Sequence, residues 1–272
     1  MKSFLVLAAG LLATAMTAQA QETGLPLWEA GAFAGTASAP SYPGSPDRST
    51  RSLLLPYLVY RGEVLRMERG GIDARLLHTN ALEFDVGFSA SLPSSSQDSL
   101  TRQAMPDLGT LVEFGPRLKL TLARPAPGHR VRLELPLRTV LEVNSGVRQQ
   151  GVVFEPELRY EARDIGAGWA LRSSVSVILG DQKLNRYFYE VAPVYATATR
   201  PAYEARAGLI ATRLTFDTTR EINPDVRIFG QLRLESYAGA ANQNSPLSVQ
   251  SSGVSVGVGV AWTLGRSETR AP

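Results

Sequence analysis

Few side chains in this chain could carry out acid–base, nucleophilic or metal chemistry, because the sequence holds two histidines and no cysteine. A lipid hydrolase built on His, Ser and Asn would need the Ser beside the His, and His78, which precedes Asn80, has no such serine. His129 follows Pro127-Gly128, so both histidines are interpreted as turn residues. Two separated histidines do not predict a transition-metal site. We therefore assign no catalytic, cofactor-binding or metal residue, and we expect no cofactor and no enzymatic activity.

The charged residues that remain alternate with apolar ones, which places them on one face of predicted strands. One interpretation is that opposite charges pair across neighbouring strands and fill a narrow lumen. The other is a selectivity lining for a solute channel, although Arg and Glu are long enough to occlude a barrel of about 12 strands. We favour the structural network, and no carboxylate pair stands out as a hydrolase site. The set comprises Arg130, Arg132, Glu134, Arg138, Glu155, Glu157, Arg159, Glu161, Arg163 and Arg172.

Aromatic residues near the ends of predicted strands are typical of anchors at the headgroup level of a membrane. These are Trp28, Tyr57, Tyr60, Trp169 and Trp262. The run Tyr187-Phe188-Tyr189 lies in a predicted outer loop, where exposed aromatic rings could contact a partner. We favour the alternative that this run folds back over the mouth of the barrel.

Charge and the N-terminus indicate the compartment. The net charge of +3 is too small to argue for nucleic acid, and the 25 Arg and 3 Lys do not cluster. Lys2, an apolar run from Phe4 to Met16, and Ala18-Gln19-Ala20 make the three parts of a secretory signal peptide. The run is shorter than the roughly 20 residues that span a bilayer. We expect residues 1–20 to be a signal peptide, cleaved after Ala20.

Alternation with a period of two is the main structural signal. In residues 82–90, Leu82, Phe84 and Val86 share one face, whereas Glu83 and Asp85 share the other. Several such segments run beyond the 5–6 residues of a typical globular strand, toward the roughly 9–11 that cross a membrane. An apolar stripe opposite a polar face favours a lipid-facing barrel over a soluble sandwich. The sequence therefore predicts an all-β, transmembrane antiparallel β-barrel formed by one domain over residues 21–265.

The predicted barrel has about 12 strands, an even number that leaves both termini in the periplasm. Long connections alternate with short ones, as expected for outer loops and periplasmic turns. Residues 185–197 also have strand character, but a thirteenth strand would break the parity, so they are assigned to an outer loop. Residues 266–272 are expected to be a short disordered tail. The strands are predicted at 27–37, 52–60, 63–68, 71–78, 81–91, 109–123, 129–143, 151–163, 167–180, 202–214, 225–238 and 252–264.

Five short segments are distinctive in their order and spacing: residues 41–45 (SYPGS), 55–61 (LPYLVYR), 186–191 (RYFYEV), 200–208 (RPAYEARAG) and 244–247 (NSPL). In these segments the chain shows a resemblance to the MltA-interacting protein (MipA) / OmpV family of outer-membrane proteins. It implies a barrel in the Gram-negative outer membrane, in contact with its lipid. It also implies a scaffold that links a lytic transglycosylase to a murein synthase. The expected function is therefore a non-enzymatic scaffold, and a narrow porin-like channel for small solutes is the alternative.

Overall fold

The computed structural model describes residues 24–61, 65–68, 71–78, 82–91, 95–97, 99–143, 146–163 and 165–271, and the expected signal peptide lies outside them. Thirteen strands among these residues form one antiparallel sheet. The first seven are β1 (Trp28–Pro40), β2 (Arg48–Arg61), β3 (Leu65–Glu68), β4 (Gly71–His78), β5 (Leu82–Ser91), β6 (Thr110–Ala123) and β7 (His129–Val143). The others are β8 (Val147–Phe154), β9 (Glu157–Ala162), β10 (Trp169–Gly180), β11 (Gly208–Glu221), β12 (Val226–Ser236) and β13 (Ser252–Arg266).

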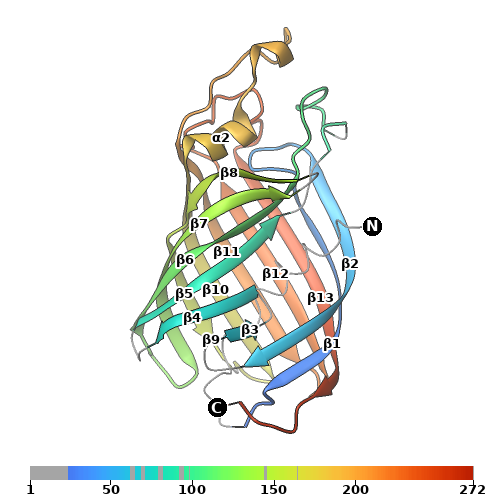
Figure 1. Ribbon diagram of the computed structural model, residues 1–272, viewed down its shortest axis with the longest axis vertical. Coiled ribbons are helices and arrows are strands. Elements are labelled where there is room, and N and C mark those ends of the chain that lie inside the picture. Colours follow the sequence, from blue (N-terminus) through green and yellow to red (C-terminus); the bar gives the residue numbers. More distant parts are fainter. Residues whose placement is uncertain are drawn as a thin grey trace.

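The sheet curves around an interior, and its last strand returns to its first. The β13–β1 register runs from Glu29↔Arg266 to Ser38↔Val256, and β10 pairs along its length with β11. Figure 1 shows the inclined strands surrounding this interior. β8 and β9 both pair with β7 and with β10, and together they replace the one strand expected at 151–163. Pro156 lies in the break, where its missing N–H cannot continue the ladder.

Side chains alternate between the two faces of the sheet, as the sequence predicted. On β13, Val254, Val258 and Trp262 are exposed on the outer face, whereas Gly257 and Ala261 are buried on the inner face. This alternation gives the sheet an apolar exterior, and it sends the polar side chains of the other strands inward.

Part of the interior is apolar. Phe33 on β1 is fully buried and packs edge-on against Phe229 on β12, with ring centroids 6.0 Å apart. Gly259 on β13 makes room for this ring, because a Cβ there would lie 2.6 Å from Phe33 Cζ. Gly259 thus allows β13 to pack closely against the ring of Phe33 on the neighbouring strand β1.

The two ends of the sheet differ. One end, here called the loop end, carries residues 41–47, 99–109, 181–207 and 237–251, and lies uppermost in Figure 1. The other, the turn end, carries the short turns at 124–128, 165–168 and 222–225 together with the segments 24–27 and 267–271. The long connections thus lie at one end, as the sequence predicted, but the connection between β7 and β8, expected to be a long loop at 144–150, is short because β8 already begins at Val147.

Residues 185–197 are not a strand. They contribute to α2 (Gln182–Tyr189) and to the 3-10 helix η1 (Pro193–Tyr195). Asp181 caps α2, because its side chain accepts a 2.8 Å hydrogen bond from the Leu184 N–H. None of the helices in the described ranges is long and apolar enough to cross a membrane.

One strand in the second half of the chain was predicted with the wrong bounds. The strand expected at 202–214 begins at Gly208 and continues to Glu221, because Tyr203 pairs instead with Val191 in the loop. The expected tail is described up to residue 271. Its residues run back along the segment 24–28, with 2.8 Å hydrogen bonds from Leu27 N to Thr269 O and from Ala271 N to Leu25 O.

Candidate functional site

The charged faces predicted on β7, β8–β9 and β10 meet inside the sheet. Arg132 on β7 forms an ion pair of 2.5 Å with Glu161 on β9, and Arg172 on β10 lies 3.8 Å from the same carboxylate. Arg159 on β9 forms an ion pair of 3.0 Å with Glu134 on β7. The predicted cross-strand pairing of opposite charges is thus confirmed.

This pairing extends toward β5 in one direction. Arg117 on β6 contacts Asp85 on β5 at 2.9 Å and Glu134 on β7 at 3.8 Å. Lys119 lies 2.5 Å from Asp85, which is fully buried. Charges on four consecutive strands are therefore linked through shared carboxylates.

A second cluster surrounds Glu155, which together with Pro156 lies in the break between β8 and β9. Its carboxylate binds Arg138 on β7 at 2.5 Å and Arg213 on β11 at 2.7 Å. Arg213 also forms an ion pair of 2.6 Å with Glu235 on β12. Arg213 and Glu235 were not predicted from the sequence, although charged residues alternate with apolar ones along β12 and could have indicated Glu235.

A third cluster lies near the turn end. The Glu29 carboxylate on β1 forms an ion pair of 2.8 Å with Arg61 on β2 and one of 3.0 Å with Arg227 on β12. Glu29 was also missed, because it is a single charge before a run of small residues. Arg227 reaches past β13 to make this contact, so the cluster joins strands that are not adjacent in the sheet.

The interior charges have little contact with solvent. The side chains of Glu134 and Asp85 are 2% and 0% exposed, and those of Arg132 and Glu161 are both 5% exposed. A wide water-filled passage along the strands would leave such groups accessible. Buried charges are tolerated when they are paired, and each of these forms at least one ion pair. The described part of the interior is therefore filled by its own side chains.

The loop end is covered by the chain itself (Figure 1). Tyr187 on α2 accepts a 2.7 Å hydrogen bond from the Gly109 N–H and donates one of 3.0 Å to Glu142 on β7. Burial and the neighbouring Glu142 carboxylate raise the pKa of Tyr187 above its usual range. Tyr189 is buried as well. The aromatic run 187–189 thus folds back over the interior, which is the alternative that the sequence favoured.

Polar contacts hold this cover together. Arg102 Nη1 donates to the Phe188 carbonyl at 3.1 Å. Arg200 Nη1 donates to the Thr101 carbonyl at 2.8 Å, and its Nη2 donates to the Tyr195 carbonyl at 2.8 Å. These bonds fasten the loop before β6 to the long connection between β10 and β11.

Four of the five aromatic residues predicted to be membrane anchors are exposed or partly exposed on the sheet, and Tyr57 is not. Trp28, Tyr60 and Trp262 are exposed on the outer face, and Trp169 is partly exposed, with Arg220 5.4 Å from its ring centroid. Tyr57 instead points inward and shares a 2.5 Å hydrogen bond with Thr263. Residues three apart on a strand face opposite sides, so Tyr57 and Tyr60 could not both contact lipid.

The histidines lie apart. His129 is the first residue of β7 rather than a turn residue, and its Nδ1 shares a 2.6 Å hydrogen bond with the Tyr160 hydroxyl. His78 is the last residue of β4, and its side chain lies outside the description. Within the described ranges, no three His, Cys, Asp or Glu residues group to hold a metal ion.

Comparison with known proteins identifies the family. The model of the family "MltA-interacting protein MipA" matches residues 32–264. The chain belongs to the MipA family. No curated protein sequence matches this MipA-family chain.

Solved structures of outer-membrane proteins are only distantly similar to this MipA-family chain. A bacterial polysaccharide outer membrane secretin is 9% identical, with a TM-score of 0.40 over 87% of this chain and 99% of that one. An outer membrane channel from Pseudomonas putida F1 is 11% identical, with a TM-score of 0.37 over 90% and 98%. Outer membrane phospholipase A from Escherichia coli is 10% identical, with a TM-score of 0.34 over 86% and 92%. Likenesses at this level say nothing of what this chain binds.

Proposed function

We propose that this chain is a closed, twelve-stranded β-barrel of the Gram-negative outer membrane and that it acts as a non-enzymatic scaffold for murein-remodelling enzymes. The strand count follows when β8 and β9 are taken as one interrupted strand of the thirteen, since both pair with β7 and β10. The return of β13 to β1 supports closure. A signal peptide cleaved after Ala20 belongs to this proposal, and the mass of the mature protein tests it.

The exterior suits a lipid environment. Val254, Val256 and Val258 on β13 are between 44% and 58% exposed, and Leu54 on β2 is 75% exposed. A soluble protein would have to keep this continuous apolar surface in water, whereas a barrel turns it toward lipid. Trp28, Tyr60 and Trp262 supply aromatic side chains at strand ends.

The filled interior is the observation that favours a scaffold. Charges with exposures of only a few per cent occupy the space that a channel would need, and α2 covers the loop end. The surfaces of such a barrel, rather than a passage through it, are then what it offers to other molecules. The family description names an interaction with MltA, which supports a lytic transglycosylase as partner, and a murein synthase follows from the scaffold hypothesis.

The docking surface is placed at the turn end, which faces the periplasm in this proposal. The segments 24–28 and 267–271 form a short ladder there, which broadens a surface otherwise made of short turns. A cross-linked pull-down tests the proposal with the detergent-purified barrel and solubilised envelope proteins. Recovery of a lytic transglycosylase or murein synthase by the intact chain, and its loss when residues 267–272 are deleted, is expected. Recovery of neither enzyme by the intact chain would refute the scaffold.

A narrow channel is the second candidate, and the charged interior is the observation that favours it. Lumen charges select ions and solutes in barrels that conduct. A channel requires the interior ion pairs or the cover at the loop end to open, so it predicts measurable conductance in a planar lipid bilayer.

A further inference from the structure

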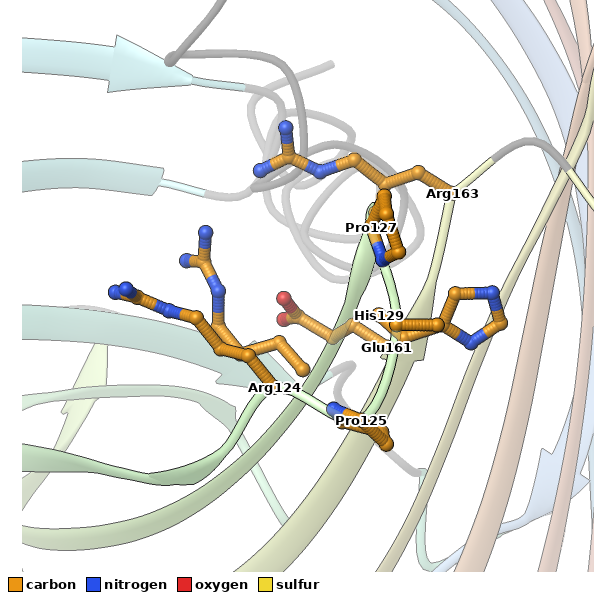
Figure 2. Close-up of a pocket in the computed structure, with 9 residues that line it drawn as sticks. Arg124, Pro125, Pro127, His129, Glu161 and Arg163 are labelled. Carbon is orange, nitrogen blue, oxygen red and sulfur yellow. The ribbon is translucent and has the colours of Figure 1, made fainter.

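Arginines at the two ends of the sheet have different surroundings. At the turn end, Figure 2 shows Arg124 and Arg163 on either side of the Glu161 carboxylate, and each of these residues already interacts with another group of the chain. At the loop end, Arg48 is exposed at the start of β2. No acidic side chain in the described part of the chain forms an ion pair with Arg48, so its positive charge is not neutralised by these residues.

The Arg48 side chain lies along the outer face of the sheet. Its Nη2 donates to the Ser38 hydroxyl on β1 at 3.2 Å, and its Nη1 donates to the Val254 carbonyl on β13 at 2.8 Å. These bonds hold the guanidinium across two neighbouring strands, whereas a side chain that only sought water would extend away from them. An arginine has five N–H donors, and these two contacts use one on each terminal nitrogen. The other N–H groups are directed by a guanidinium whose orientation is already fixed.

Hydroxyl groups lie beside Arg48 on the same face. Thr50 on β2 donates to Ser38 Oγ at 3.0 Å, and Ser52 donates to Thr36 Oγ1 at 3.2 Å in the next cross-strand pair. Ser38 thus accepts from both Arg48 and Thr50. A hydroxyl has two acceptor lone pairs and one hydrogen, so Ser38 retains its hydrogen to donate. Arg48 and Ser38 together therefore present donors, but no negative charge, to the outside of the sheet.

The adjacent acid faces elsewhere. Asp47 precedes Arg48, and neighbouring residues of a strand point to opposite sides. The Asp47 carboxylate accepts a 2.7 Å hydrogen bond from the Ser99 hydroxyl, which belongs to the loop before β6. Its charge is therefore directed into the loops and not toward the donors on the outer face.

The position of Arg48 along β2 corresponds to the depth of lipid headgroups. Trp28 pairs with Tyr60 at the turn end of β1 and β2, and Pro40 pairs with Arg48 at their other end. Between Tyr60 and Arg48, 12 residues of about 3.3 Å each, inclined by roughly 40°, span about 30 Å along the barrel axis. The apolar band of such barrels is about 25 Å tall and is flanked by aromatic residues. With Trp28 and Tyr60 at one edge of this band, Arg48 lies at the opposite edge.

We propose that Arg48 and Ser38 bind the phosphate of a lipid headgroup in the leaflet at the loop end. The planar fork of arginine matches phosphate oxygens, and the Ser38 hydroxyl supplies a further donor, which Thr50 orients. A positive side chain near a membrane surface attracts anionic lipids. Leu54, closer to the middle of β2, is 75% exposed on the same face and can contact the acyl chains of the same lipid. The inference rests on the proposed membrane barrel, but not on its scaffold role.

The test is native mass spectrometry of the full-length barrel, released from an uncharged detergent, which counts the lipid molecules that stay bound. The probes are phosphatidylglycerol and a galactosyl diacylglycerol with the same acyl chains and no phosphate. Phosphatidylglycerol should bind at least roughly tenfold more tightly, because galactose offers no anionic oxygen to the guanidinium. Equal binding of the two lipids by the wild-type barrel would overturn the site.

Variants connect the binding to this face of the sheet. Arg48→Gln should weaken the binding of phosphatidylglycerol by roughly 10–100-fold, and Ser38→Ala should weaken it by roughly threefold. Arg51→Gln is the matched control, because this exposed arginine lies on the same strand, three residues away, and belongs to the other face. It should bind phosphatidylglycerol as the wild type does.

Migration of the folded band on a gel without boiling shows that each variant is assembled. A barrel that assembles but binds phosphatidylglycerol equally well as Arg48→Gln and as Arg51→Gln would contradict the lipid site. That result would leave the proposed barrel intact, because failure of the barrel itself appears as loss of the folded band, and failure of the scaffold appears in the pull-down.

Discussion

Arg213 on β11 reaches past β10 to the Glu155 carboxylate, and the two side chains form an ion pair of 2.7 Å. Glu155 also binds Arg138 on β7 at 2.5 Å, so one carboxylate joins strands on both sides of the β8–β9 break. The break itself allows this, because Glu155 lies where the regular ladder is interrupted by Pro156. The ion pairs of Glu155 thus link β7 to β11, which are not neighbours in the sheet.

Removing this carboxylate should destabilise the sheet. Glu155→Ala leaves Arg138 and Arg213 buried with one anion fewer, and breaking a buried pair in this way costs about 3–5 kcal/mol. The free energy of unfolding in urea, followed by tryptophan fluorescence, measures the loss. Glu204→Gln is the control, because its side chain is 77% exposed and its pair with Arg186 should contribute about 0–1 kcal/mol. An unchanged free energy for Glu155→Ala would show that the cluster contributes nothing.

The cover at the loop end should respond to alkaline pH through Tyr187. Its pKa is raised by burial and by Glu142, so the folded chain keeps the proton where the unfolded chain, near pH 10, has lost it. The stabilising contribution is therefore complete below about pH 10 and is lost as pH rises above that value. The difference in tyrosinate absorbance between wild type and Tyr187→Phe gives the titration of this one hydroxyl. A midpoint at or below pH 10 would contradict the hydrogen-bonded arrangement.

Gly259 should tolerate no side chain while Phe33 stays in place. A Cβ at Gly259 would lie 2.6 Å from the Phe33 ring, and overpacking of this kind costs about 1–3 kcal/mol. Gly259→Ala should lower the unfolding free energy, and Phe33→Leu in the same chain should restore part of it. Gly265→Ala serves as control, since its Cβ would meet Trp28 at an ordinary 3.7 Å. Equal stability of the two glycine variants would refute this packing.

The alternation of residue types correctly predicted which side chains of a strand point into the interior where one face of the strand is polar. On β7 and β13 the alternation fixes which side chains point inward, because a shift of one residue would reverse every side chain. On β2 both faces are apolar, with Leu53, Tyr57 and Val59 inside and Leu54 and Leu58 outside. The pattern there does not distinguish the faces, and Tyr57 was placed on the wrong one.

The errors elsewhere come from contacts between distant segments. The aromatic run at 187–189 favours a strand locally, but the Asp181 cap and packing over the interior make it a helix. The hydrogen bonds between residues 267–271 and residues 24–28 likewise join the two ends of the chain, and no local pattern indicates them. Ion-pair partners such as Arg213 and Glu155 depend on strand order and register, which a single sequence does not contain.

Single-channel recording in a planar lipid bilayer tests whether the interior of this protein is filled. Wild-type barrel should insert without stepwise conductance, because its interior charges are buried and paired and its loop end is covered. An open porin of known conductance, reconstituted in the same way, shows that insertion can be detected. Reproducible conductance steps from wild-type protein would show that the interior is open and would favour the channel.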